Sequence, residues 1–123
     1  MHELGIVFHI IREVKEVAAE NNCAHVSKVV MNIGEVSAIV PYLLTDCWDW
    51  AVRKEDLLNG CKLEVNTVPA VTFCETCKRE YETVRHGKTC PYCNSGDTYL
   101  LRGNEVEIKE IEVSGPDASA QGS

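Results

Sequence analysis

The sequence predicts an α/β (α+β) fold, in which two helices pack on a small three-stranded sheet and a zinc-ribbon module is inserted before the last strand. Residues 3–20 repeat their apolar side chains with a helical period, and three later segments alternate apolar and polar residues. Two Cys-x-x-Cys pairs lie between the second and third of these segments. The chain has 123 residues, of which 45% are hydrophobic and 25% charged, a balance typical of a folded globular protein.

The first helix is predicted over Glu3–Glu20. Charged residues occupy most of the opposite face, and Asn21 and Asn22 mark the end of the helix. The apolar stripe consists of Leu4, Val7, Phe8, Ile11, Val14 and Ala18.

A second helix is predicted from Pro41 to about Glu55. Proline is tolerated in the first helical turn because its missing N–H would have no partner there. Cys47 falls within the apolar stripe of this helix, which predicts a small core residue. The stripe consists of Leu44, Cys47, Trp48 and Ala51.

Three strands are predicted, at Val26–Ile33, Cys61–Val68 and Glu105–Val113. In the third strand the apolar positions change parity between residues 108 and 111. A β-bulge near Lys109 and Glu110 would let both apolar pairs face the core. The order of elements predicts an α/β domain formed by residues 1–70 plus 103–113, a zinc-ribbon domain over residues 71–102, and a disordered tail at 114–123.

Four of the seven cysteines form the pairs Cys74/Cys77 and Cys90/Cys93. Two such turns can direct four thiolates at one ion, and an all-thiolate set favours a structural zinc ion. An iron–sulfur cluster could use the same ligands. The segment Cys90-Pro-Tyr-Cys93 is also the sequence of a thiol redox pair, but the following Asn-Ser-Gly does not begin the helix that such a pair requires.

The charge and the distribution of apolar residues disfavour several other classes of protein. The net charge of −7 disfavours binding to nucleic acid or anionic membrane surfaces. No apolar run reaches the length of a membrane span, and Glu3 stands where a signal peptide would carry basic residues. We therefore expect a cytoplasmic protein. We expect no enzymatic activity, since neither a phosphate-binding glycine loop nor a nucleophile with a matched base can be assigned.

The first residues form a second candidate metal site. The α-amine of Met1, the amide nitrogen of His2 and the His2 imidazole can close fused chelate rings around one ion. A planar set of deprotonated nitrogens suits Ni(II) or Cu(II). Surface histidines at a terminus are commonly just solvated, so this chemistry alone leaves both interpretations open.

The sequence resembles the hydrogenase maturation nickel metallochaperone family (HypA/HybF) over about residues 1–113. The resemblance is carried by Met1-His2-Glu3-Leu4, by Ile33-Gly34-Glu35-Val36-Ser37, by the paired Cys-x-x-Cys motifs and by Gly103-Asn104-Glu105. It implies a carrier that inserts nickel into the large subunit of [NiFe]-hydrogenase together with a hydrogenase-maturation GTPase. The oligomeric state, including a homodimer, and urease as a further client stay open.

The resemblance also implies the metal sites. Nickel would bind at His2, with Glu3 adjacent, and structural zinc at Cys74, Cys77, Cys90 and Cys93. His9 and His25 are expected to be solvated or structural, whereas His86 is a candidate additional nickel ligand. Two other functions remain as alternatives, namely a zinc-ribbon adaptor or nucleic-acid-binding module, and a thiol oxidoreductase.

Overall fold

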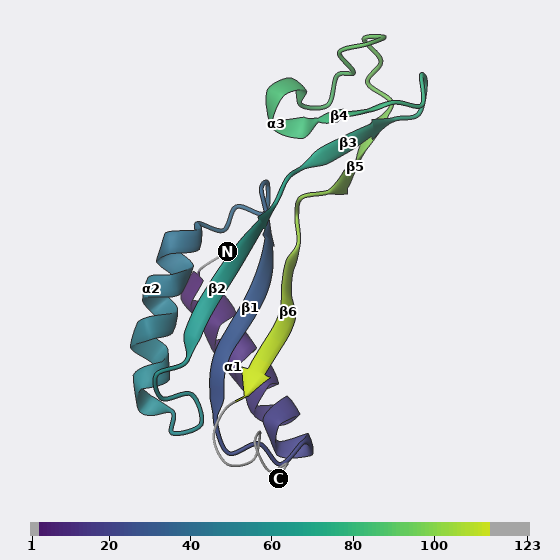
Figure 1. The fold of residues 1–123 in the computed structure, drawn as a ribbon. Helices are drawn as coiled ribbons and strands as arrows, with labels where there is room; N and C mark the ends of the chain where they lie inside the picture. The colour runs from purple at the N-terminus through teal and green to yellow at the C-terminus, as the bar shows by residue number, and fades with distance from the viewer. Residues whose placement is uncertain (1–2, 114–123) are drawn as a thin grey trace. The chain divides into compact units, whose positions relative to one another are not determined.

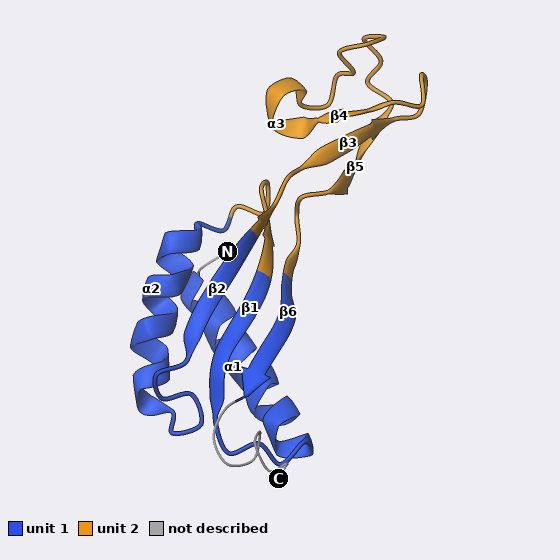
Figure 2. Cartoon of the chain, in the orientation of Figure 1, with its two compact units in different colours: residues 1–31, 39–66, 107–123 blue, residues 32–38, 67–106 orange. Residues whose placement is uncertain are grey.

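The structure, a computed structural model, describes residues 3–113 (Figure 1). The chain divides into two compact units (Figure 2). The first comprises residues 1–31, 39–66 and 107–123, and the second comprises residues 32–38 and 67–106. The predicted tail at 114–123 lies outside the described residues.

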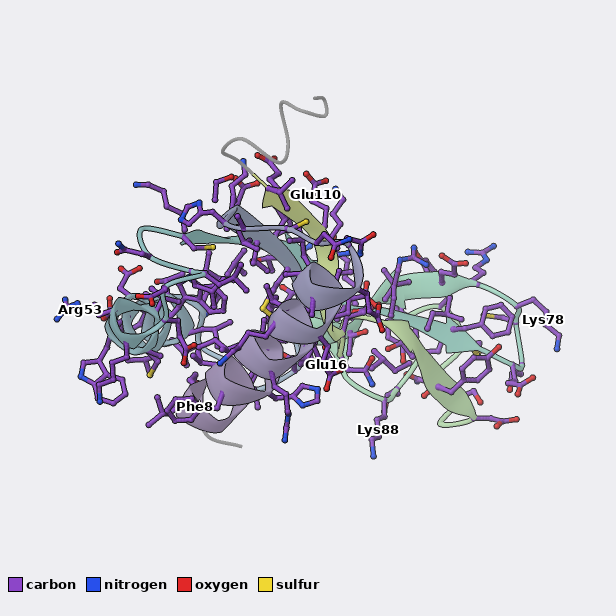
Figure 3. All side chains as sticks on the ribbon, turned by 90° about the horizontal axis from the view of Figure 1, so that it is seen from below. Phe8, Glu16, Arg53, Lys78, Lys88 and Glu110 are labelled. Carbon is purple, nitrogen blue, oxygen red and sulfur yellow. The ribbon has the colours of Figure 1, made fainter. Side chains whose placement is uncertain are left out.

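The first unit contains two helices and a three-stranded sheet with the order β2-β1-β6. Both helices lie on the same side of this sheet; Phe8 and Glu16 project on the helix side, and Glu110 lies on the strand side (Figure 3). A 3₁₀ turn, η1, continues α2. The elements are α1 (Glu3–Glu20), β1 (Val26–Gly34), α2 (Pro41–Ala51), η1 (Val52–Lys54), β2 (Lys62–Val68) and β6 (Val106–Val113).

Apolar burial between the helices and the sheet builds the core of the first unit. Trp48 is fully buried, and its indole Nε1–H donates a hydrogen bond to the carbonyl oxygen of Cys61 at 3.0 Å. This bond satisfies the only polar group of the indole, so the large ring fills the core without a desolvation penalty. The other fully buried large side chains of this unit are Val7, Val14, Val26, Val29, Met31, Leu44 and Leu58.

The second unit is a small ribbon. Its sheet has the order β4-β3-β5, and β3 pairs antiparallel with both neighbours. The hydroxyl groups of Thr72 and Thr83 form a hydrogen bond of 2.6 Å beneath this sheet. The elements are β3 (Val71–Cys74), β4 (Glu80–Glu82), a single helical turn α3 (Thr83–His86) and β5 (Thr98–Arg102).

The segments around Gly34 and Gly103 contact each other within the second unit. The N–H of Gly34 donates to the carbonyl oxygen of Glu105 at 2.7 Å, and the N–H of Val36 donates to that of Gly103 at 2.8 Å. A side chain on Gly34 would collide with the backbone of Gly103. The Glu35 carboxylate accepts a hydrogen bond from the N–H of Ala70 at 2.8 Å, so both motifs serve a close backbone crossing.

The predicted α/β class is confirmed, and the first helix has the predicted bounds. The second helix is shorter than predicted, because its last residues form η1. Cys47 is half-buried rather than a core residue. In β6, Ile108 and Ile111 are half-buried, whereas Val106 and Val113 are 40% and 37% exposed, because β6 lies at the edge of its sheet.

Candidate metal centre

The sulfur atoms of the four paired cysteines form one cluster in the second unit. All four Sγ atoms lie within 4.8 Å of one another. The Sγ atoms of Cys74 and Cys93 are 3.6 Å apart, as are those of Cys77 and Cys90. A tetrahedron with Zn–S bonds of about 2.3 Å has edges of about 3.8 Å, so the cluster fits a four-coordinate metal ion.

Each cysteine pair lies on a tight turn, and the two turns have matching backbone bonds. The N–H of Lys78 donates to the carbonyl oxygen of Cys74, and that of Asn94 donates to Cys90, both at 2.9 Å. Lys78 and Asn94 have φ of 64° and 65°, in the left-handed region. This reversal of the chain after each pair lets both sulfurs of one turn point to the same side.

Backbone N–H groups polarise the cluster. The N–H of Cys77, and secondly that of Thr76, stabilise the thiolate of Cys74 and lower its pKa to about 7, although burial acts in the opposite direction. Burial raises the pKa of Cys77. The Cys74 thiol therefore ionises more readily than an ordinary cysteine.

The cluster is also the core of its unit. Cys74 and Cys90 are fully buried, and they pack with Tyr81, which is 5% exposed. The Tyr81 hydroxyl donates to the carbonyl oxygen of Gly87 at 2.9 Å. So few apolar residues cannot hold a fold of this size alone, and bonds from four thiolates to one ion would supply the missing stabilisation.

The geometry disfavours thiol redox catalysis. The residues after Cys93 continue as a loop up to β5, which begins at Thr98, so no helix dipole acts on Cys90. The Sγ of Cys90 lies against that of Cys77. A four-thiol cluster is thus the arrangement present, rather than an isolated redox pair.

The predicted nickel ligands Met1 and His2 lie outside the described residues. Glu3 is described and is half-buried at the start of α1. Its carboxylate accepts a hydrogen bond from the N–H of Val40, the residue before α2, at 3.0 Å. This bond connects the first turn of α1 to the start of α2. The sequence alone does not predict this contact, because the two residues are 37 positions apart.

The remaining histidines have local partners. His9 is exposed and forms an ion-pair contact with Glu13 at 3.2 Å, and the Nε2 atom of His25 lies 2.7 Å from the carbonyl oxygen of Asn59. Both fit the expected solvated or structural role. His86 lies edge-on to the ring of Tyr81, with ring centres 5.9 Å apart. Among the described residues, the four cysteines form the only group of three or more potential ligands.

The fold and this cluster define a class: a small α/β protein with a four-cysteine metal-binding ribbon. Residues 1–113 match the family model described as hydrogenase/urease nickel incorporation, metallochaperone, hypA. The chain therefore belongs to the HypA family of hydrogenase maturation proteins, as the resemblance indicated.

Curated relatives span nearly the same length. The chain is 35% identical to the hydrogenase maturation factor HypA of Trichodesmium erythraeum, over 92% of this chain and 96% of that protein. It is 30% identical to HybF of Klebsiella pneumoniae, over 91% and 98%. It superposes on the solution structure of the nickel metallochaperone HypA from Helicobacter pylori with a TM-score of 0.69 and 23% identity, over 92% and 97% of the chains, which supports the fold.

Two further observations concern the family description and the helices. The family model and the curated relatives are described as a nickel metallochaperone and as hydrogenase maturation factors. Among the described residues, no helix has the length and apolar character needed to cross a bilayer.

Proposed function

We propose that this protein is a nickel metallochaperone, which receives Ni(II) at its N-terminus and delivers it to maturing [NiFe]-hydrogenase, while its four cysteines hold a structural zinc ion. It would act in the cytoplasm with a hydrogenase-maturation GTPase and donate to the hydrogenase large subunit. Family membership and the compact four-thiol cluster carry this proposal. The reducing cytoplasm keeps such thiols available for a metal.

The chemistry of the two donor sets supports a division of labour. Four thiolates around one ion leave no position for another ligand, so an ion bound there is retained as part of the fold. The amine of Met1 with the amide and imidazole of His2 offers a planar nitrogen set that leaves a fourth position for exchange with a client. A carrier needs the second kind of site, because its cargo must leave.

The contact of Glu3 with Val40 refines the proposed nickel site. His2 is bonded directly to Glu3, whose side chain anchors the first helical turn. A Glu3→Gln substitution keeps an oxygen that can accept the Val40 N–H but removes the negative charge. If the Glu3 carboxylate binds nickel, this variant weakens nickel binding without altering α1, whereas Glu3→Ala would also lose the anchoring hydrogen bond.

The decisive variant is His2→Ala. We expect it to abolish stoichiometric nickel binding measured by calorimetry, and to leave zinc content and the circular dichroism spectrum unchanged. Nickel affinity of the unmodified chain should fall below about pH 6, because a protonated imidazole is no ligand. An N-terminal extension should weaken binding too, since it converts the terminal amine into an amide.

His86→Ala is the matched control, because it removes an imidazole from the ribbon instead. Wild-type nickel affinity in His2→Ala would contradict the proposed site. Loss of nickel binding in His86→Ala with zinc retained would instead add His86 to the ligand set. In cells, loss of hydrogenase activity in His2→Ala and its partial recovery with excess nickel would link the site to delivery.

A further inference from the structure

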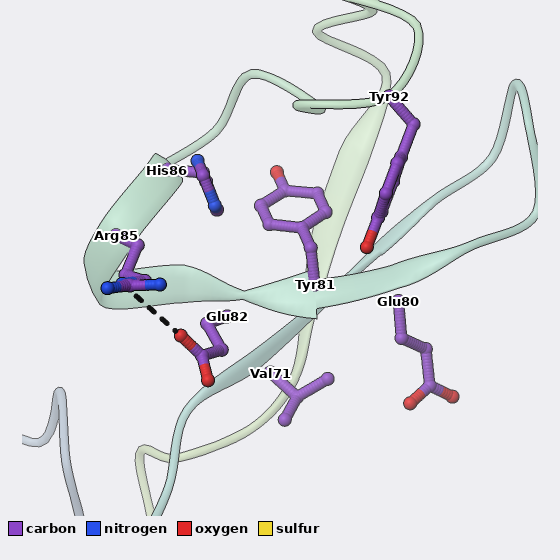
Figure 4. Close-up of a pocket in the computed structure, with 7 residues that line it drawn as sticks. All are labelled: Val71, Glu80, Tyr81, Glu82, Arg85, His86 and Tyr92. Atoms are coloured by element: carbon purple, nitrogen blue, oxygen red, sulfur yellow. Dashed lines mark ion pairs between the residues drawn. The ribbon is translucent and has the colours of Figure 1, made fainter.

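The free edge of β4 in the ribbon borders a cavity. This cavity has a volume of about 420 Å³ and is lined by Val71, Glu80, Tyr81, Glu82, Arg85, His86 and Tyr92 (Figure 4). Since the sheet order is β4-β3-β5, only one edge of β4 is paired with another strand of this sheet. The unpaired edge of a strand is a template for an additional strand.

The strand register shows which backbone groups face this edge. Tyr81 pairs with Thr72, and the flanking bonds run from the N–H of Cys74 to the carbonyl oxygen of Arg79 and from the N–H of Thr83 to that of Ala70. In an antiparallel pair, residues alternate between facing the partner strand and facing away. Residues 79, 81 and 83 face β3, so the N–H and C=O of Glu80 and the N–H of Glu82 face away from it.

The side chains around this edge differ between the two faces of the sheet. The carboxylates of Glu80 and Glu82 lie on the same face as Val71. Tyr81, Tyr92 and His86 lie on the other face (Figure 4). An added strand would also alternate, so it would present one set of side chains to the carboxylates and the other to the aromatic rings.

The carboxylates are held only weakly by this chain. Glu80 lies 3.7 Å from the guanidinium of Arg102, and Glu82 lies 3.6 Å from that of Arg85. All four side chains are at least half exposed, and exposed pairs at this distance contribute little to stability. A basic side chain of a partner can therefore replace these contacts at small cost.

We propose that the free edge of β4 binds an extended segment of another protein, in which basic side chains alternate with apolar ones. The backbone of this segment would pair with Glu80 and Glu82, its basic side chains would meet the two carboxylates, and its apolar side chains would pack on the face that carries Tyr92, which is 57% exposed. The net charge of −7 favours the same basic partner over distance. This interaction does not require His2 or Glu3, the proposed nickel ligands at the N-terminus.

Other occupants fit less well. In a second copy of the chain, antiparallel pairing of β4 with β4 would place Glu80 opposite Glu82, and like charges opposite each other destabilise a strand pair. Residues 114–123 of this chain contain an aspartate but neither a basic nor a large apolar residue, so they lack both required side-chain types.

The test uses the zinc-loaded full chain and the peptide Lys-Val-Lys-Val-Lys, with both ends blocked. We expect titration to shift the amide NMR signals of Glu80 and Glu82 and to slow their hydrogen exchange. The peptide Glu-Val-Glu-Val-Glu should not bind. A Lys-Val peptide methylated at alternate backbone nitrogens should bind at least several-fold more weakly, because it cannot pair with the strand.

Two variants probe the protein side. Glu80→Pro removes the outward-facing N–H at a position where an edge strand tolerates proline. This variant should weaken peptide binding about three- to tenfold. The double variant Glu80→Gln/Glu82→Gln keeps every backbone group and should weaken binding about tenfold at low salt, less at high salt. Glu110→Gln in β6 removes the same type of charge from another strand and should have no effect.

Several results would overturn the proposal. These are equal binding of the methylated peptide, binding without protection of the Glu80 and Glu82 amides, unchanged affinity in the double variant, or no binding at millimolar peptide. Zinc content measured on each variant shows whether weaker peptide binding comes from the change at the edge of β4 or from unfolding of the ribbon.

Discussion

The two units of this protein reach stability by different routes. The first buries a continuous apolar core around Trp48, Met31 and Leu44, and its helices and sheet hold this core without a metal. The second has Tyr81 as the large side chain at the centre of its core, beside the buried sulfurs of Cys74 and Cys90. Apolar area thus stabilises one unit, whereas bonds from the four thiolates to a metal ion would stabilise the other.

This difference bears on how each unit would treat a metal ion. In the ribbon the candidate ligands are also the core, so release of a bound ion would be expected to unfold the unit. In the first unit the core residues Trp48, Met31 and Leu44 are not proposed nickel ligands, so an ion bound at the N-terminus could leave with this core intact. The contrast supports the assignment of the retained ion to the cysteines and of the cargo to the N-terminus.

The largest expected effect is that of Cys90→Ala. Structural zinc in small modules contributes roughly 10–16 kcal/mol of binding free energy at neutral pH, so three remaining thiolates should not hold the ion or the ribbon. Zinc content should fall from one ion per chain to none, measured by atomic absorption. Hydrogen exchange should lose protection in residues 71–102 while α1 and β1 stay protected.

Cys47→Ala is the matched control, because Cys47 lies in α2 and contributes no ligand. Its zinc content should equal that of the unmodified chain. Zinc retained at full occupancy in Cys90→Ala, or unfolding of α1 along with the ribbon, would contradict the proposed separation of the two units.

The converse variant is Trp48→Ala. Removing a fully buried indole should destabilise the first unit by about 3–5 kcal/mol, and it leaves the carbonyl oxygen of Cys61 without its donor. The urea midpoint followed by far-ultraviolet circular dichroism should fall accordingly, with zinc still bound. Trp50→Ala removes an indole that is 46% exposed and should cost much less. Simultaneous loss of zinc in Trp48→Ala would show that the units fold together.

The sequence predicted most of the first unit, because its signals are local. The helical period over Glu3–Glu20 and the alternation in β1 and β2 reflect burial against one continuous core, and Pro41 marks the first residue of α2. The four cysteines were identifiable for a related reason: two Cys-x-x-Cys turns specify the ligand set by spacing alone.

The details that sequence reasoning missed depend on contacts between distant residues. The strands β3 and β5 have only four and five residues, and the apolar and polar residue types in them do not alternate regularly, so there is no clear strand signal in the sequence there. The contact of Glu3 with Val40, the close crossing of Gly34 with Gly103, and the cavity beside β4 arise only when separate segments meet. In α1 the buried stripe also differs from the predicted one, because Ile6 and Ile10 are buried whereas Phe8 is 51% exposed.

The smallest expected effect concerns the alkaline stability of the first unit. Burial raises the pKa of Cys61 from 9.0 to about 11, so the folded chain holds this proton more tightly than the unfolded chain does. The resulting stabilisation is complete below pH 9 and is lost as the pH rises toward 11. Urea midpoints of zinc-loaded wild type and Cys61→Ala should therefore differ by a constant amount at pH 7 and 8, and this difference should shift against the wild type between pH 9 and 11. A pH-independent difference over the whole range would show that the pKa of Cys61 is the same in the folded and the unfolded chain.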